Sequence, residues 1–183
     1  MTKKSFFRDW ETVIKEMPIK IKRKRRPVFY LAHSFSERHW VRDVLMKRLQ
    51  RAGIQTLNPF YNPDGSWKED RPEVKHADLH GGITTRFKRI VQRHAEEIVE
   101  GDLALIRRAV RDGGGVVGYM VEPTVGTSSE LFYCGYVLKA PTYLLTPNTK
   151  LRWHPWLRYY CVIVPSIRQL ILKIKELYKI GRV

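Results

Sequence analysis

Short apolar runs alternate with helical patterns along most of this chain. Five runs rich in β-forming residues predict strands, because each is short and is bounded by polar or turn-forming residues. Between most of them, apolar residues recur every three or four positions, which indicates amphipathic helices. The predicted strands cover 28–32, 54–57, 116–121, 142–146 and 161–165, and the predicted helices cover 36–51, 84–110, 131–139 and 166–180.

Boundary residues accompany several of these helices. Ser36 is the expected N-cap of the first helix, and Gly53 follows its last turn. Ser166 is the expected N-cap of the last helix. Gly101 predicts a break in the helix expected over 84–110, because glycine weakens a helix interior.

The alternation of strands and helices predicts an α/β fold. We expect a doubly wound, mostly parallel five-stranded sheet of order 2-1-3-4-5, with helices on both faces. In such sheets, ligands bind beyond the carboxyl ends of the strands, where the strand order reverses. That crevice would lie between the loop HSFSE after the first strand and the loop EPTVGTSSE after the third.

Chain length and one long polar segment set the expected domain organisation. A chain of 183 residues, 43% of them hydrophobic, supports one sizeable core. We expect a basic N-terminal extension over 1–26 and a single domain over 27–183. The segment 62–88 is polar, contains Pro and Gly, and is long for an ordinary connection. We interpret it as an insert, either a lid over a ligand or a surface elaboration.

Charge widens the range of expected partners. The chain has 34 Lys and Arg against 18 Asp and Glu, a formal charge of +16, which attracts nucleotides, nucleic acids or acidic membranes without choosing among them. The basic run KIKRKRR at 20–26 predicts a solvated lead-in, with non-specific nucleic-acid contact as the alternative. RWHPWLRYY at 152–160 indicates core packing or subunit contact, with a single-strand-binding surface as the alternative.

Cysteine usage and hydropathy indicate the compartment. Cys134 and Cys161 lie in apolar runs without metal-ligand spacing, so we expect two buried thiols of a reducing compartment. The N-terminus lacks the apolar core of a signal peptide, and no run approaches the roughly 20 apolar residues that span a bilayer. We expect a cytoplasmic protein without a membrane partner. His76, His80 and His94 form no recognised metal spacing, and no metal is expected.

Glu130 stands at the expected start of the helix over 131–139. Thr127 and Glu130 fit a capping box, in which the Thr hydroxyl binds the N–H three residues on and the Glu reaches back. Local sequence therefore leaves two interpretations of Glu130, a helix cap or a catalytic carboxylate.

Three segments occur together in a suggestive order: FYLAHSF at 29–35, EGDLALI at 100–106 and EPTVGTSSELFYCGYVLKAPTYLLTP at 122–147. This combination resembles the nucleoside 2-deoxyribosyltransferase-like superfamily, whose members have a strand-one aromatic residue, an Asp-Leu helix motif and a Gly-x-x-x-Glu-Leu-Gly-like loop. The resemblance covers about 28–62 and 90–147.

Within that superfamily, PTVGTSSE at 123–130 is most similar to the Pro-Ser-x-Gly-x-x-x-Glu pattern of the 2'-deoxynucleoside 5'-monophosphate N-glycosidases. The resemblance implies that Glu130 is the nucleophile, that Asp102 assists the departing base and that Tyr30 positions the nucleophile. A carboxylate beneath C1' suits an oxocarbenium-like transition state, so two carboxylates suffice without a cofactor.

The resemblance also implies a phosphate site. Ser34 matches a first-loop serine that binds phosphate, and His33 beside it is a further candidate. Thr124 stands where transferases for free nucleosides have an Asp and the monophosphate hydrolases a Ser; a neutral hydroxyl suits a phosphate that a carboxylate would repel. Backbone N–H groups at the helix start would add donors. These come from Gly126, Thr127 and Ser128.

Aromatic residues near the insert are the base-binding candidates. The rings of Phe60, Tyr61 and Trp67 could stack on a base or pack the insert onto the body. Two positions depart from the family pattern: Phe132 replaces the Gly after Glu-Leu, and His33 replaces a frequent Gly. Either change could narrow the site.

The implied reaction is hydrolysis of the N-glycosidic bond of (deoxy)nucleoside 5'-monophosphates, which releases the base and (deoxy)ribose 5-phosphate through a glycosyl-Glu130 intermediate. The resemblance also implies a homodimer, because the family commonly builds dimers. Alternatives are base exchange by a nucleoside 2-deoxyribosyltransferase, a non-catalytic nucleotide- or nucleic-acid-binding protein on this fold, and an NAD-cleaving domain of related topology.

Overall fold

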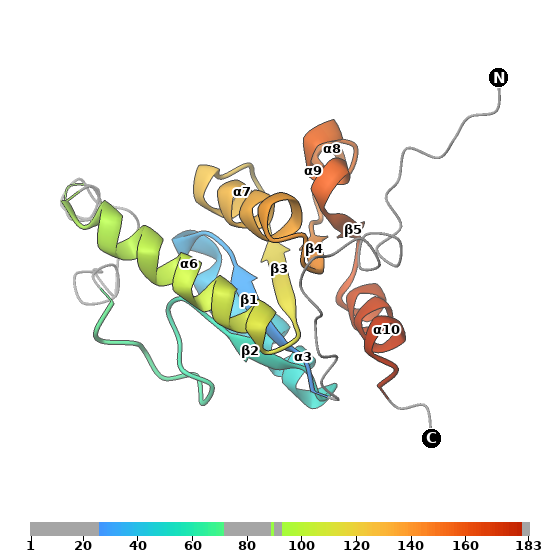
Figure 1. Ribbon diagram of the computed structural model, residues 1–183, viewed down its shortest axis with the longest axis horizontal. Coiled ribbons are helices and arrows are strands. Elements are labelled where there is room, and N and C mark those ends of the chain that lie inside the picture. The colour runs from blue at the N-terminus through green and yellow to red at the C-terminus, as the bar shows by residue number, and fades with distance from the viewer. Residues whose placement is uncertain (1–25, 72–88, 90–92, 181–183) are drawn as a thin grey trace.

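The sheet has the predicted order. The computed structural model describes residues 26–71, 89 and 93–180, and in it five parallel strands pair in the order β2-β1-β3-β4-β5 (Figure 1). Each predicted strand is present within one or two residues at either end. The strands are β1 Val28–Ala32, β2 Gln55–Leu57, β3 Gly115–Tyr119, β4 Thr142–Leu145 and β5 Val162–Val164.

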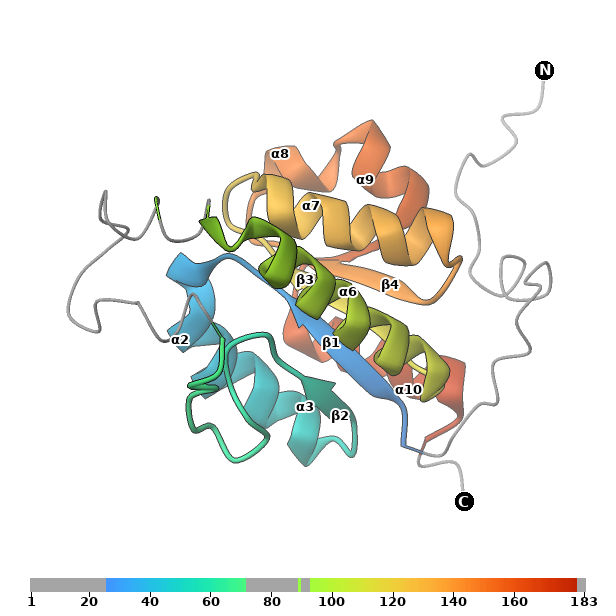
Figure 2. The same cartoon turned by 60° about the vertical axis from the view of Figure 1, so that its left-hand side comes forward.

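Helices cover both faces of the sheet, which confirms the doubly wound fold (Figure 2). One face packs against a continuous helical segment from Phe35 to Arg51 and against α10. The other face packs against α6, α7 and α9. The helical elements are η1 Phe35–Glu37, α2 Arg38–Trp40, η2 Val41–Met46, α3 Lys47–Arg51, α6 Ala95–Arg111, α7 Val125–Phe132, η3 Tyr133–Val137, α8 Thr149–Arg152, α9 Pro155–Tyr160 and α10 Ile167–Tyr178.

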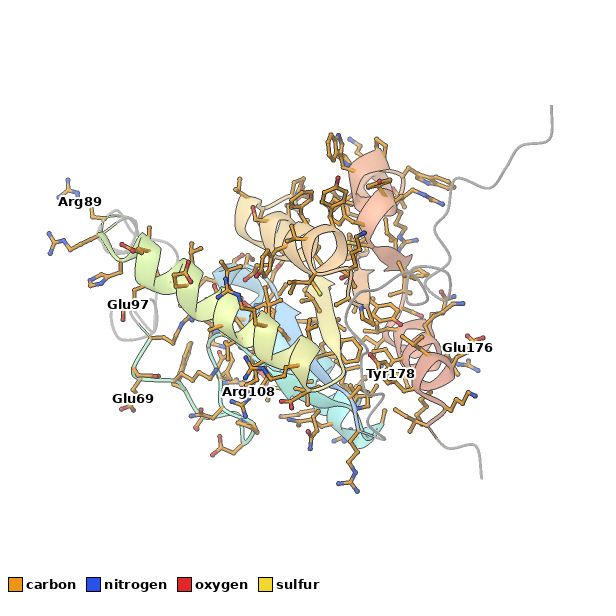
Figure 3. All side chains as sticks on the ribbon, viewed as in Figure 1. Glu69, Arg89, Glu97, Arg108, Glu176 and Tyr178 are labelled. Carbon is orange, nitrogen blue, oxygen red and sulfur yellow. The ribbon has the colours of Figure 1, made fainter. Side chains whose placement is uncertain are left out.

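Side-chain alternation along β1 builds both cores. Phe29 packs in the core under α10, where the ring of Tyr178 meets it edge-on at 6.0 Å. Tyr30, the next residue, points to the opposite core under α6 and α7, as strand geometry requires. Glu97 on α6 and Glu176 on α10 are exposed and face away from the sheet (Figure 3).

Three helix boundaries differ from those predicted. The first helical segment is capped by Ser34, not Ser36, because Ser34 is extended while Ser36 already lies inside the first turn. The helix around Gly101 is unbroken, since tertiary contacts of α6 outweigh the roughly 0.5–1 kcal/mol that an interior glycine costs. The helix predicted over 131–139 begins six residues earlier, at Val125.

Two short helices were not predicted. Asn148 caps α8 by accepting hydrogen bonds from the N–H groups of Lys150 and Leu151, and Pro155 opens α9. These helices contain most of the stretch 152–160. Leu157 and Tyr160 are buried in the core, whereas Trp153 and Trp156 are exposed. The stretch therefore contributes side chains both to the core and to the exposed surface.

Close packing beneath α7 fixes its height above the sheet. An ideal Cβ on Gly118 would lie 2.9 Å from the Leu131 side chain, closer than real carbon contacts allow. Glycine at this position therefore lets Leu131 sit directly on β3. This contact helps to fix the position of the neighbouring residue, Glu130.

Several expectations fall on residues that the structure does not describe. Residues 1–25 of the basic extension, 72–88 of the insert and 90–92 lie outside the described residues. The described part of the insert, 62–71, begins with a turn that an antiparallel bridge between Tyr61 and Trp67 closes. Cys134 and Cys161 are buried and not in a disulfide, as predicted. Among the described helices, none is long and apolar enough to cross a bilayer.

Candidate active site

The loops after β1 and β3 meet where the strand order reverses. The chain leaves β1 toward β2 on one side and later returns to pair β3 on the other. Glu37, in the first helical turn after β1, accepts a hydrogen bond from the backbone N–H of Val121 at 2.9 Å. The two loops are therefore tied together at the reversal of strand order, the position where ligands bind in sheets of this kind.

Tyr30 and Glu130 meet between β1 and α7. The Tyr30 hydroxyl donates to Glu130 Oε1 at 2.6 Å, the short distance typical of a bond to a carboxylate. Tyr30 is fully buried and Glu130 is half-buried. These two residues are 100 positions apart in the chain, so only the fold brings them together.

The capping-box interpretation of Glu130 is wrong. The N-cap of α7 is Thr124, and Thr127 already lies in the helix interior, so Glu130 sits in the second turn rather than at the first. A carboxylate there cannot reach the helix's own open N–H groups. Its hydrogen bond goes to Tyr30 instead.

Asp102 lies on α6, across the site from α7, and is paired with a residue that sequence reasoning did not select. Arg71 Nη2 donates to Asp102 Oδ1 at 2.9 Å, and both side chains are largely buried. Arg71 comes from the described part of the insert. Asp102 and Arg71 both act electrostatically on Glu130, which groups two carboxylates, one cation and one phenol around a single site.

The environment shifts the protonation of this group. Burial is the main cause that raises the pKa of Glu130 well above its usual value, and the negative charge of Asp102 adds to it, while the Tyr30 hydrogen bond and Arg71 oppose it. Burial and the charge of Glu130 likewise raise the pKa of Tyr30. A carboxylic acid and a neighbouring phenol that both have displaced pKa values are typical of functional sites.

A pH-dependent stability follows from the raised pKa of Glu130. The folded state keeps this proton to a higher pH than the unfolded chain, whose Glu pKa is about 4.3. The free energy of unfolding is therefore expected to fall as pH rises from about 4.3 through the folded-state pKa of Glu130. Glu130→Gln, which cannot ionise, should be more stable than the native protein at pH 7.5 and nearly equal to it at pH 4.

Urea unfolding of both proteins at the two pH values measures this difference. A structural cap predicts the opposite sign, because losing a capping carboxylate lowers stability at neutral pH. A Gln variant that is less stable than the native protein at pH 7.5 would therefore contradict the buried-acid description of Glu130.

His33 and Ser34 occupy the loop after β1. His33 Nδ1–H donates to the Ser34 carbonyl at 3.0 Å, and Nε2 accepts from Asn58 Nδ2–H at 3.2 Å. Burial lowers the pKa of His33 to about 4, so the ring is neutral at pH 7. His33 thus joins this loop to the start of the 58–71 segment, while the Ser34 hydroxyl donates to Glu37 at 3.0 Å.

The start of α7 offers polar groups. Thr124 and Thr127 each have a buried hydroxyl oxygen without a hydrogen-bond partner among the described residues. The N–H of Ser128 already bonds to the Thr124 carbonyl at 3.1 Å, so the open backbone donors are those of Val125, Gly126 and Thr127 rather than Ser128. Ser128 instead lines a cavity of about 430 Å³ between α7 and α9.

The predicted base-binding aromatics form a cluster of their own. Phe60 and Tyr61 are buried, and Trp67 is half-buried beside Tyr61, with ring centroids 4.6 Å apart. Phe35 completes the cluster, and the Arg38 guanidinium lies 3.9 Å above its ring. In this arrangement the aromatics pack the start of the insert onto the body; stacking on a base stays a prediction, with Trp67 the most accessible ring.

No protein-family model, curated protein or solved structure matches this chain. Its assignment therefore depends on the site itself. Within residues 26–71, 89 and 93–180, no three His, Cys, Asp or Glu side chains gather closely enough to hold a metal ion.

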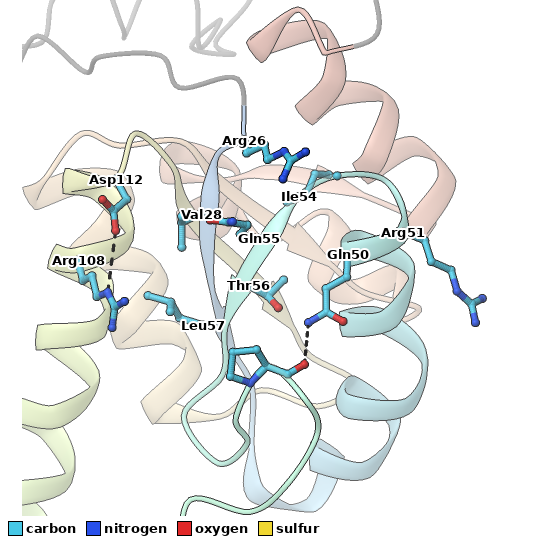
Figure 4. Close-up of a pocket in the computed structure, with 12 residues that line it drawn as sticks. Arg26, Val28, Gln50, Arg51, Ile54, Gln55, Thr56, Leu57, Arg108 and Asp112 are labelled. Carbon is cyan, nitrogen blue, oxygen red and sulfur yellow. Dashed lines mark hydrogen bonds and ion pairs between the residues drawn. The ribbon is translucent and has the colours of Figure 1, made fainter.

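A second cavity lies away from Asp102 and Glu130. It measures about 550 Å³ and runs along the open edge of β2, between the last turns of α3 and α6 (Figure 4). Arg26, Arg51 and Arg108 line it. Gln50 and Pro63 line it too, and the Gln50 side chain donates a hydrogen bond to the Pro63 carbonyl. None of the site residues predicted from the sequence lines this cavity.

Proposed function

We propose that this protein hydrolyses the N-glycosidic bond of (deoxy)nucleoside 5'-monophosphates. The observation that carries the proposal is the 2.6 Å hydrogen bond from Tyr30 to Glu130 at the reversal of strand order, with Asp102 on the facing helix. The resemblance of 123–130 and 100–106 to the monophosphate N-glycosidases selects this chemistry among those that two carboxylates can perform.

The proposed reaction proceeds in two steps. The Glu130 carboxylate attacks C1' as the bond to the base nitrogen breaks. Asp102, the second acid at the site, gives a proton to the departing base. Water then gives a proton to the Asp102 carboxylate and attacks C1' of the glycosyl ester, which frees the Glu130 carboxylate and yields (deoxy)ribose 5-phosphate. The Tyr30 hydrogen bond holds one carboxylate oxygen, so the other is presented to the sugar.

The test is direct. The protein is incubated separately with each deoxynucleoside 5'-monophosphate, each ribonucleotide and the matching nucleosides, and free base is measured by chromatography. Release of base from a monophosphate, but not from its nucleoside, supports the proposal. No release from any of these substrates would overturn it.

Base exchange is the closest alternative, because a second base could capture the sugar in place of water. Transfer of deoxyribose to labelled adenine would identify a transferase. A nucleic-acid-binding protein is a second alternative, favoured by the exposed Trp153 and Trp156 next to Arg158, whose guanidinium lies 4.8 Å from the Trp153 ring. Strongly salt-dependent DNA binding without any base release would identify it.

The phosphate site gives a prediction. Thr124→Asp is expected to weaken use of the monophosphate more severely than Ser34→Ala, because a carboxylate repels the phosphate whereas the alanine only removes one hydrogen bond. Asp is a good N-cap, so α7 should still form. The measurement is the ratio of kcat/KM for monophosphate and nucleoside. Thr124→Ser, which keeps a hydroxyl, is the matched control, and an unchanged ratio in Thr124→Asp would contradict the assignment.

We propose a homodimer that works in the cytoplasm. Exposed aromatic rings gather where α7 and its continuation approach α9: Tyr136 stacks on Phe132 with centroids 5.0 Å apart, and Trp156 lies beside them, 66% exposed. Aromatic residues of this kind are enriched at subunit contacts. The two unpaired cysteines favour a reducing compartment. Sedimentation of the native protein and of Trp156→Glu tests the dimer.

A further inference from the structure

A short segment of the insert contacts α6, the helix that carries Asp102. Lys68 Nζ donates to the Asn58 carbonyl at 2.6 Å, and the Arg71 N–H donates to the Lys68 carbonyl at 3.1 Å. These bonds hold residues 58, 68 and 71 together, and Arg71 extends from this turn to α6. The Arg71 side chain is only 10% exposed there and binds Asp102 at 2.9 Å.

Gly101 provides the space for this arginine. An ideal Cβ at position 101 would lie 2.8 Å from Arg71 Nη1, a distance that real Cβ atoms essentially never show. Glycine in a helix interior weakens the helix relative to alanine, so the residue needs a reason. Here the reason is that the Arg71 guanidinium packs against the backbone of α6 at Gly101, where a Cβ atom would collide with it.

Charge gives the arginine a role beyond packing. Three groups act on Glu130 from the elements around it: Tyr30 from β1, Asp102 from α6 and Arg71 from the 58–71 segment. Burial and Asp102 favour the protonated acid, whereas Arg71 and Tyr30 favour the ionised carboxylate that a nucleophile requires. Lys68 also lies within electrostatic reach of Asp102 and Arg71, but its ammonium is bound to the Asn58 carbonyl.

We propose that Arg71 is a positioning residue of the N-glycosidase site, whose guanidinium holds Asp102 in place and puts a positive charge near the two carboxylates, and that Gly101 leaves the space that this guanidinium occupies. The proposal rests on the proposed function. Arg71 and the rest of 63–89 lie outside the segments that resemble the N-glycosidases, so this device belongs to the insert of this chain.

The first test compares Arg71→Met with Arg71→Lys. Removing the charge is expected to lower kcat/KM at pH 7 by about tenfold or more and to move the acidic limb of the pH profile to higher pH, so that activity recovers as pH rises. The Lys variant keeps the charge and should return the limb toward its native position. Equal losses at every pH in both variants would indicate a purely structural arginine and overturn the proposal.

The second test uses Gly101→Ala, which leaves Arg71 in the chain but fills the space that its guanidinium occupies. The acidic limb should move in the same direction as in Arg71→Met, while thermal unfolding shows that the helix is retained. In the Arg71→Met background, Gly101→Ala should cause no further shift, because the side chain that it displaces is gone. If the shifts of the acidic limb add up in the double variant, Gly101 does not act by making room for Arg71.

A readout without substrate separates this proposal from the proposed function. The carboxyl carbon of Glu130, assigned by its loss in Glu130→Gln, is titrated by ¹³C NMR in the native protein, Arg71→Met and Arg71→Lys. A higher pKa for Glu130 in Arg71→Met alone supports the role of Arg71 even if no base is released from any nucleotide. An unchanged titration in Arg71→Met would overturn it even in an active enzyme.

Discussion

Glu130→Gln is expected to lower base release by about 10⁴-fold or more, because loss of a covalent nucleophile has effects of this size. Gln has nearly the same shape and keeps an oxygen that can accept the Tyr30 hydrogen bond. Its neutral amide cannot attack C1' or form a glycosyl ester. Single-turnover assays with a deoxynucleoside monophosphate, read by chromatography, measure the loss, and circular dichroism checks the fold.

Glu122→Gln is the matched control, since Glu122 is an exposed acid of the same loop. That variant should keep its activity. A folded Glu130→Gln protein that releases base at a rate within tenfold of the native protein would show that Glu130 is not the nucleophile. Trapping of a glycosyl adduct on Glu130 in the native protein, and its absence in the variant, gives independent support.

The strand order could be predicted because each strand is a distinct apolar run. The run 116–121 reads as buried on both faces, and Val116 and Val117 do pack into opposite cores. With helices between most strands, a parallel sheet follows, and its reversal point lies between β1 and β3. The position of the strand-order reversal can therefore be predicted from the sequence alone.

The role of Glu130 could not be decided locally. Four hydroxyl residues precede it, at 124 and 127–129, and each is a possible N-cap. The choice of Thr124 depends on how α7 sits on β3, where Gly118 admits Leu131. Because this contact joins distant parts of the chain, local sequence alone leaves both the capping box and the catalytic acid open.

Arg71 could not be selected from the sequence, since it lies in a polar segment among many other cations. The one available signal was Gly101 next to Asp102, which we interpreted as a helix break. A glycine inside a long amphipathic pattern indicates either a break or a close approach by another group. Here it is a close approach, and the approaching group, Arg71, comes from 30 residues earlier in the chain.

Tyr30→Phe is expected to lower kcat/KM at pH 7 by about 10²-fold, the typical cost of a reacting group that is no longer held in place. The hydroxyl is the fully buried donor to Glu130, and its hydrogen bond lowers the pKa of that acid. Without it, Glu130 should stay protonated to a higher pH. The loss should therefore be greatest in acid and should shrink as pH rises, which a pH profile of kcat/KM measures.

Tyr143→Phe is the control for this change, because Tyr143 is a buried tyrosine of the same sheet that points into the opposite core. Its hydroxyl is remote from the carboxylates, so the pH profile of that variant should match the native one. If Tyr30→Phe keeps full activity, the hydrogen bond serves only to satisfy a buried phenol. If instead the loss is equal at every pH, Tyr30 orients Glu130 without tuning its charge, and Arg71 alone opposes the effect of burial on that acid.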